Sequence, residues 1–194
     1  MSIYLDFNPP LVLASKSPRR QQLLRELGFN FTIKAKDTDE SYPENLSPED
    51  VPSFLAIKKA KALLNEVEDE IIIASDTIVV LEKTILGKPK DYDHAYEMIS
   101  NLSGKTHQVI TGVCLLNKTK QVVFSDTTQV KLKNLSKEEI DYYIKRCKPF
   151  DKAGAYGIQE WLGMAAIERI EGSYFNVMGL PTHKLYTELL KFNQ

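Results

Sequence analysis

Residues 71–81 read Ile-Ile-Ile-Ala-Ser-Asp-Thr-Ile-Val-Val-Leu, an apolar run with one ionisable side chain, Asp76, near its middle. β-branched residues at this density predict a buried strand. We expect Ser75, Asp76 and Thr77 to interrupt it, because acids are depleted from strands. A buried carboxylate is costly unless it is paired or bound to metal, so Asp76 is a candidate general base or magnesium ligand. The structural alternative is an aspartate bonded to the backbone or to an arginine.

Strand-like and helix-like segments alternate on both sides of this run. Upstream, we expect strands at residues 11–14 and 29–36 and helices at residues 18–27 and 47–64. Downstream, the pattern predicts a return strand at 85–86, a hairpin of 106–116 and 122–132, a strand near 165–170, and helices at 92–102, 136–146 and 182–192. Hairpins and strand–helix crossovers together predict an α/β domain with a mixed sheet.

The composition excludes several classes of protein. The 194 residues include 25 Lys and Arg against 26 Asp and Glu, and this balance argues against a nucleic-acid binder. No apolar run approaches the ~20 residues of a membrane helix, and residues 1–10 do not resemble a secretory signal. Cys114 and Cys147 are too few for a disulfide framework or a structural zinc site. We therefore expect a soluble cytoplasmic protein.

The segment Ser15-Lys-Ser-Pro-Arg-Arg20 is a candidate anion site. It lies where a predicted strand ends and a helix begins, and the free N–H groups of a helix start favour an anion. Arg19 and Arg20 add forked donors that match phosphate oxygens. The alternative is a capped surface helix with solvated arginines.

Further candidates are single charged residues. Glu40 lies in an acidic loop, where the alternative is a solvated acid. Lys58 and Lys59 both fall near the apolar stripe of the second predicted helix, and the sequence does not choose between them. Lys88 is held between Gly87 and Pro89. Hard acids with phosphate-seeking cations indicate magnesium-assisted phosphate chemistry.

Other reaction classes lack their motifs in this sequence. There is no nucleophile elbow, no Walker loop and no Cys/His metal cluster. Three histidines lack metal-like spacing and are predicted to be ordinary surface or helix-flank residues: His94, His107 and His183.

The sequence resembles the Maf family of nucleoside triphosphate pyrophosphatases in blocks that occur in order from about residue 11 to 190. These blocks are Leu13-Ala-Ser-Lys-Ser-Pro-Arg-Arg20, Ala74-Ser-Asp-Thr77, Leu86-Gly-Lys-Pro89, Leu102-Ser-Gly-Lys-Thr-His107, Asp151-Lys-Ala-Gly-Ala-Tyr-Gly-Ile-Gln159, Ile170-Glu-Gly-Ser-Tyr174 and Val177-Met-Gly-Leu-Pro181. The resemblance implies a single Maf-like domain over residues 1–194. Its fold would be Maf/ITPase-like, a mixed twisted sheet flanked by helices, with an active-site cleft between two lobes.

The activity that this resemblance implies is hydrolysis of a nucleoside triphosphate to the monophosphate and pyrophosphate, in a nucleotide house-cleaning role. Asp76 matches the proton acceptor, and Glu40 matches an acid near the metal, so both are expected to hold a divalent cation, Mg²⁺ or Mn²⁺. The remaining matches concern the substrate: Arg19, Thr77 and Gln159 for substrate choice, and Ser15, Arg20, Lys59 and Lys88 around the triphosphate.

Within the family, Ser17-Pro-Arg-Arg20, Asp76-Thr77 and Tyr156-Gly-Ile-Gln159 resemble the branch that acts on dTTP and UTP. The branch that acts on 7-methyl-GTP tends to have an aromatic residue in place of Arg19. The chain departs from the family pattern at residues 160–163, Glu-Trp-Leu-Gly, where many members are smaller and richer in glycine. Trp161 either reaches the base pocket or is a surface or core tryptophan.

Two alternatives to the dTTP/UTP assignment stay open. One is a nucleotide-sensing regulatory protein of cell division with little turnover, and the other is the 7-methyl-GTP branch of the same family. The expected partner is the nucleotide substrate, with no nucleic acid and no membrane. A homodimer is expected only by analogy, because dimers are common among such enzymes.

Overall fold

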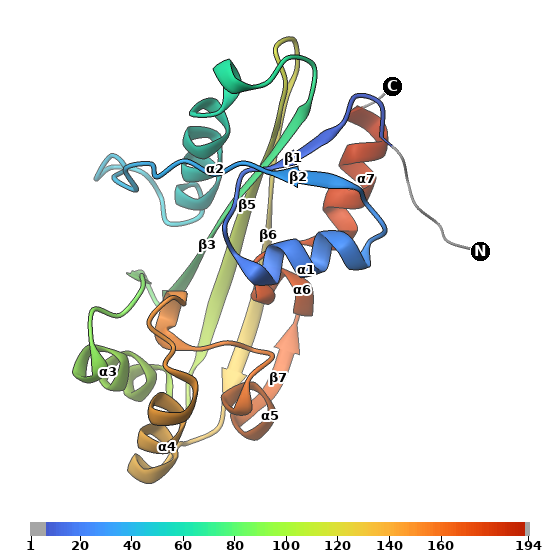
Figure 1. The fold of residues 1–194 in the computed structure, drawn as a ribbon. Coiled ribbons are helices and arrows are strands. Elements are labelled where there is room, and N and C mark those ends of the chain that lie inside the picture. Colours follow the sequence, from blue (N-terminus) through green and yellow to red (C-terminus); the bar gives the residue numbers. More distant parts are fainter. Residues whose placement is uncertain (1–6, 193–194) are drawn as a thin grey trace. The chain divides into compact units, whose positions relative to one another are not determined.

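The computed structural model describes residues 7–192, which divide into two compact units (Figure 1). Unit 1 contains the chain up to residue 76, residues 111–126 and the chain from residue 179 onward. Unit 2 contains residues 77–110 and 127–178. The sequence predicted a single domain over residues 1–194. That assignment stays a prediction, and part of the expectation for residues 1–10 lies outside the described residues.

The strands form one seven-stranded sheet in the order β2-β1-β3-β5-β6-β7, with β4 paired to β3. β1 is parallel to β2 and β3, whereas β4 is antiparallel to β3 and β7 is antiparallel to β6. The prediction of an α/β fold with a mixed sheet is therefore confirmed. The strand bounds are β1 Leu11–Leu13, β2 Phe31–Ile33, β3 Ile71–Leu81, β4 Thr84–Leu86, β5 Thr106–Leu116, β6 Gln121–Leu132 and β7 Ile167–Glu171.

In unit 1, small side chains let one helix pack closely on the sheet. The helices of this unit are α1 (Pro18–Glu26), α2 (Val51–Lys61), the 3₁₀ turn η1 (Leu64–Glu66) and α7 (Thr182–Phe192). Ala56 and Ala60 of α2 are fully buried in a cluster with Ile72 and Ala74 of β3 and Val12 of β1. This close packing sets the distance between α2 and β3, and therefore the distance between Lys59 of α2 and Asp76 of β3.

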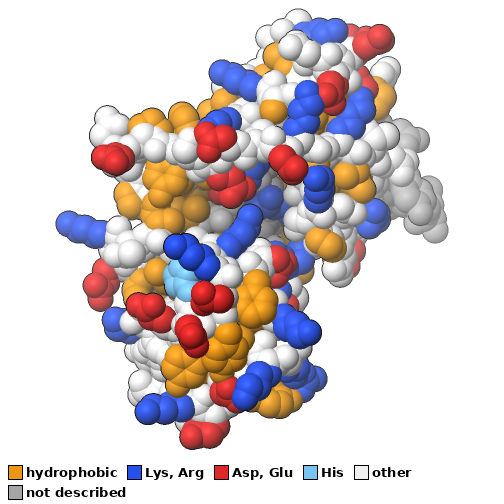
Figure 2. Space-filling model, turned by 60° about the vertical axis from the view of Figure 1, so that its left-hand side comes forward, with side chains coloured by type: hydrophobic (Ala, Val, Ile, Leu, Met, Phe, Trp, Pro, Cys, Tyr) orange, Lys and Arg blue, Asp and Glu red, His pale blue; other side chains and the backbone are white. Residues whose placement is uncertain are grey.

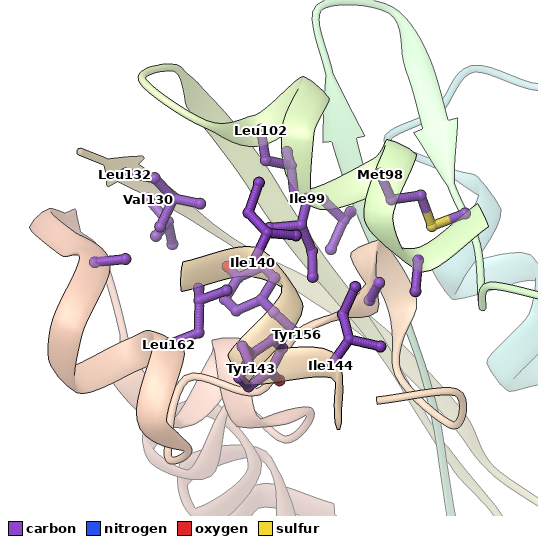
Figure 3. Packing of buried hydrophobic residues seen from close by; sticks show 14 of the residues in the cluster. Met98, Ile99, Leu102, Val130, Leu132, Ile140, Tyr143, Ile144, Tyr156 and Leu162 are labelled. Carbon is purple, nitrogen blue, oxygen red and sulfur yellow. The ribbon is translucent and has the colours of Figure 1, made fainter. Parts of the chain in front are cut away.

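In unit 2, the core forms between strand segments and the helices α3 (Tyr92–Leu102), α4 (Lys137–Cys147) and α5 (Trp161–Ala166). Figure 3 shows Ile140, Tyr143 and Ile144 of α4 gathered with Ile99, Tyr156 and Leu162. The 3₁₀ turn η2 (Ala153–Ala155) and the helix α6 (Tyr174–Met178) complete this unit. Ser136 and Glu139 cap α4 reciprocally, as the sequence predicted.

Three predicted elements differ from the structure. β3 is not interrupted at Ser75–Thr77, because the Asp76 side chain is paired and the strand tolerates it. α2 begins at Val51 rather than at residue 47, since Ser47 donates to Asp50 Oδ2 at 2.8 Å within a preceding turn. β2 is only three residues long, shorter than the alternating run from residue 29 to 36.

Within the described residues, every helix is too short or too polar to cross a membrane.

Candidate active site

Strand geometry brings Asp76 to the side of the sheet that α2 covers. Side chains alternate between the two faces of a strand, so Asp76 shares a face with Ile72 and Ala74. Those two residues are buried with Ala56 and Ala60 of α2. Lys59 precedes Ala60 on that helix, so the packing that buries the alanines also places the ammonium near the carboxylate.

The centre of the site in unit 1 is the ammonium of Lys59 between two carboxylates. Its Nζ lies 2.5 Å from Asp76 Oδ1 and 2.9 Å from Glu40 Oε1. The side chains of Asp76 and Lys59 are only 12% and 17% exposed, whereas that of Glu40 is 49% exposed. Pairing with Lys59 offsets the cost of keeping the Asp76 carboxylate largely out of water.

The Arg20 side chain hydrogen-bonds to the backbone of two distant segments of unit 1. Its Nε donates to the Gly179 carbonyl at 2.9 Å, and its Nη1 donates to the Ser75 carbonyl at 2.8 Å and to Ser15 Oγ at 3.5 Å. Burial lowers the pKa of Arg20, while the nearby Asp76 acts in the opposite direction. The guanidinium remains charged because arginine does not deprotonate in proteins.

Lys58, the residue before Lys59, binds the acidic loop that precedes α2. Lys58 Nζ lies 2.9 Å from Asp39 Oδ2 and donates to the Ser41 carbonyl at 3.2 Å. Hydrogen bonding by the Ser41 hydroxyl and then by Lys58 lowers the pKa of Asp39. Both lysines therefore point away from the core toward acids of one loop, and Lys59 also lies beside Asp76. The role that the family resemblance implied for Lys59, binding the triphosphate, stays a prediction.

The remaining predicted site residues are found as follows. Arg19 is a partly exposed residue of α1 in unit 1. Thr77, Lys88 and Gln159 belong to unit 2, and Lys88 is exposed. The Gln159 side-chain oxygen is buried with no hydrogen-bond partner among residues 7–192. Unit 1 thus brings together five of the predicted residues: Ser15, Arg20, Glu40, Lys59 and Asp76.

Sequence reasoning missed a buried polar cluster around Gln159. Lys152 Nζ lies 2.8 Å from Asp151 Oδ1 and 2.9 Å from Glu160 Oε1, although its side chain is only 8% exposed. The buried Tyr143 hydroxyl donates to Glu160 Oε2 at 2.5 Å. The sequence feature that could have indicated this cluster is Lys152, a charged residue within the otherwise mostly apolar block from Asp151 to Gln159.

The prediction that His107 is a surface or helix-flank residue is wrong. His107 is 2% exposed, and its Nε2 hydrogen-bonds with the Tyr156 hydroxyl at 2.7 Å. Desolvation lowers the pKa of His107 to about 4. Alternation in β5 places this residue inward, which the lack of metal-like spacing could not reveal.

Trp161 packs against the unit 2 core and lies edge-on to Tyr142, with ring centroids 5.0 Å apart. This position agrees with the second of the two interpretations drawn from the sequence, a tryptophan at the border of core and surface.

The donors in unit 1 fit a divalent metal of the magnesium type. Glu40 and Asp76 already converge on a cation, the Lys59 ammonium. Within residues 7–192, no three or more His, Cys, Asp or Glu side chains cluster as a self-sufficient metal site. Mg²⁺ is commonly held by one or two carboxylates together with substrate phosphates, and this pair meets that requirement.

The fold and site define an α/β protein with a lysine-bridged pair of carboxylates beside a sheet. A family model described as Maf-like protein matches residues 10–192, so the chain belongs to the Maf-like protein family. The resemblance seen in the sequence blocks is thereby confirmed.

Curated relatives match over nearly their whole length. The chain is 52% identical over 183 residues to a dTTP/UTP pyrophosphatase of Phocaeicola vulgatus, covering 93% of this chain and 95% of that protein. It is 49% identical over 188 residues to a dTTP/UTP pyrophosphatase of Porphyromonas gingivalis, covering 95% and 94%. Among solved structures, the Staphylococcus aureus Ham1 protein gives a TM-score of 0.44 at 15% identity, covering 63% of this chain and 71% of that one.

Proposed function

We propose that this protein hydrolyses dTTP and UTP to the nucleoside monophosphate and pyrophosphate. The observation that carries the proposal is the largely buried Asp76 carboxylate, which lies 2.5 Å from the Lys59 ammonium. The same ammonium also pairs with Glu40. A carboxylate at such a point can accept a proton, and the cations beside it can bind phosphate. The printed names of the relatives give the matching activity for those proteins.

In the proposed reaction, Asp76 accepts a proton from a water molecule as the water oxygen bonds to the α-phosphorus. The bond from that phosphorus to its bridging oxygen breaks, and pyrophosphate leaves. Lys59, with Ser15 and Arg20, binds the charged phosphates, and the family resemblance assigns the same role to Lys88. Glu40 and Asp76 would hold a divalent metal, Mg²⁺ or Mn²⁺, which when bound offsets the negative charge of the triphosphate.

Base choice is assigned to Arg19, Thr77 and Gln159. The buried, unpaired side-chain oxygen of Gln159 supports this assignment, because such an oxygen is an acceptor in need of a donor. Thymine and uracil share an imide N–H that is such a donor, and cytosine lacks it. The amide thus offers a physical basis for preferring dTTP and UTP over CTP.

We further place the protein in the cytoplasm, acting on a nucleotide rather than on nucleic acid. Cys114 and Cys147 are both free thiols, as a reducing compartment would leave them. On the face drawn in Figure 2, acidic and basic side chains are interspersed rather than separated into a basic stripe. That distribution supports a small charged substrate over a polyanion.

The deciding experiment compares pyrophosphate release by the wild type and Asp76→Asn, with Mg²⁺ and a panel of dTTP, UTP, CTP, GTP and 7-methyl-GTP. Removing the general base should lower turnover by ~10²–10⁴-fold. Asp69→Asn, at an exposed aspartate of the same unit, is the matched control and should keep wild-type rates.

Other outcomes would redirect the assignment. Preference of the wild type for 7-methyl-GTP would contradict the roles of Arg19 and Gln159 while leaving the chemistry intact. Binding of dTTP without release of pyrophosphate would instead favour the nucleotide-sensing regulator.

A further inference from the structure

Glu160, directly after Gln159, is an acid with a largely buried side chain. Its side chain is 21% exposed, and its two carboxylate oxygens have different buried partners. Glu160 is thus held by specific contacts and is not a solvated surface acid.

Those contacts form a continuous polar chain across one short segment. Lys152 Nζ lies 2.9 Å from Glu160 Oε1, and the Tyr143 hydroxyl donates to Glu160 Oε2 at 2.5 Å. The same hydroxyl accepts the Gly157 backbone N–H at 3.0 Å, and the Glu160 N–H donates to the Gly157 carbonyl at 3.0 Å. Gln159 lies inside this loop of bonds.

The segment is also packed too closely to move without breaking these bonds. A Cβ on Gly157 would lie 2.9 Å from Glu160 Cδ and 3.1 Å from Lys152 Cε. A Cβ on Gly163 would lie 1.8 Å from the Ile158 carbonyl oxygen, so the start of α5 rests against the segment backbone. The backbone on both sides of Gln159 is therefore fixed by contacts that include Glu160.

We propose that Glu160 is a positioning residue that, through Lys152 and Tyr143, holds Gln159 in the orientation at which it reads the pyrimidine base. This inference rests on the proposed function, and it adds a determinant of base choice outside the residues that contact substrate. Glu160 acts on the base-reading segment in unit 2, whereas Asp76 and Lys59 belong to unit 1. Loss of Glu160 should weaken discrimination between bases more than the chemical step.

The test compares steady-state kinetics of the wild type, Glu160→Ala and Glu160→Gln with dTTP and with CTP. For Glu160→Ala, the ratio of kcat/KM for dTTP to that for CTP should fall ~10–100-fold, mainly through a raised KM for dTTP. Glu160→Gln keeps the shape and one acceptor, so it should recover part of that ratio. Glu168→Ala, at an exposed glutamate of the same unit, should leave the ratio unchanged.

A purely structural role for Glu160 predicts a different result. In that case Glu160→Ala would lower thermal stability and kcat for both nucleotides together, with the dTTP to CTP ratio as in the wild type. That outcome, at an unchanged circular dichroism spectrum, would overturn the proposal.

Binding measurements separate this proposal from the proposed function. Nucleotide binding can be measured by isothermal titration calorimetry, or through the fluorescence of the single tryptophan, Trp161, two residues from Gln159. If the wild type released no pyrophosphate, the proposed function would fail. Selective binding of dTMP over CMP that Glu160→Ala loses would then still support the positioning role. Equal dTMP and CMP affinities in the wild type, or equal selectivity in both proteins, would refute it.

Discussion

His107 shows at the scale of one residue how burial alone can set a protonation state. Its side chain is nearly inaccessible, its Nε2 is hydrogen-bonded to the Tyr156 hydroxyl, and its Nδ1 is buried without a partner among the described residues. Desolvation lowers its pKa from 6.5 to about 4, so the folded protein holds the ring neutral. Tyr156 is likewise kept neutral, because burial raises the pKa of its hydroxyl.

This depressed pKa makes stability depend on pH in a defined window. Between pH 6.5 and 4 the unfolded chain binds a proton at His107 that the folded protein does not. The contribution of His107 to stability is therefore complete above pH 6.5 and falls by about 1.4 kcal/mol per pH unit on acidification through the window. Urea unfolding at several pH values should show this slope.

The comparison variant is His107→Gln, which should unfold with a shallower pH dependence over the same window. His183→Gln, at an exposed histidine, should behave as the wild type. Equal slopes for all three proteins would mean that His107 titrates normally in the folded state.

The pair of Asp76 and Lys59 shows which part of the candidate site could be predicted from the sequence and which part could not. Asp76 could be predicted as a candidate because a carboxylate inside an apolar run needs a partner. The helical pattern did not distinguish Lys58 from Lys59, since both lie near the apolar stripe of α2, and the preference for Lys59 came from the family resemblance. The contact of Lys59 with Asp76 follows from the packing of Ala56 and Ala60 on β3.

Gly112 of β5 controls how closely α2 approaches the sheet. A Cβ at this position would lie 2.3 Å from the Ser53 nitrogen and 2.4 Å from the Pro52 carbonyl carbon, so the start of α2 rests on the glycine. Both atoms are backbone, and neither can give way by a change of rotamer. The position of Lys59 therefore depends on the absence of a side chain on the neighbouring strand.

We expect Gly112→Ala to lower the free energy of unfolding by about 1–3 kcal/mol, the usual cost of overpacking, and to lower turnover because α2 is displaced. Thermal unfolding followed by circular dichroism measures the first effect, and pyrophosphate release measures the second. Gly87→Ala is the stability control, since its added methyl group would have no neighbour within 4 Å. Equal stability of the two variants would contradict the packing argument.

Helices with a clear capping residue or a regular apolar pattern in the sequence were predicted with nearly correct bounds. Elements that lack such local features were missed or predicted with the wrong extent. The bounds of α3 and α7 match the sequence prediction, and α4 carries the predicted capping box. α5 was missed because it has only six residues and no side-chain cap, so its position comes from packing on the unit 2 core. The continuity of β3 through Asp76 likewise depends on a tertiary partner.

At the scale of the whole molecule, metal is expected to serve the reaction and not the fold. The described part of the chain has no self-sufficient cluster of metal ligands, and the two clusters described above consist of hydrophobic residues. Removing divalent ions with EDTA should therefore abolish pyrophosphate release and leave Tm unchanged. Added Mg²⁺ should restore the activity.

Two variants test whether the metal requirement for activity depends on the carboxylate pair of Glu40 and Asp76. Glu40→Gln should raise the Mg²⁺ concentration needed for half-maximal activity, because it removes one of the two carboxylates. Glu44→Gln, at an exposed glutamate of the same loop, should not. A fall in Tm on chelation would point instead to a structural metal.

The strand pairings of unit 1 also imply an order of assembly during folding. β5 and β6 are neighbours joined by a short turn at residues 117–120, so their pairing is local. β1 pairs in parallel with β3, Leu11 opposite Ile71, and this contact must close a long stretch of chain. Long-range parallel pairings form slowly, since loop closure costs entropy before contacts compensate for it. Ser15, Lys59 and Asp76 depend on that pairing, so we expect this cluster of polar residues to form late in folding.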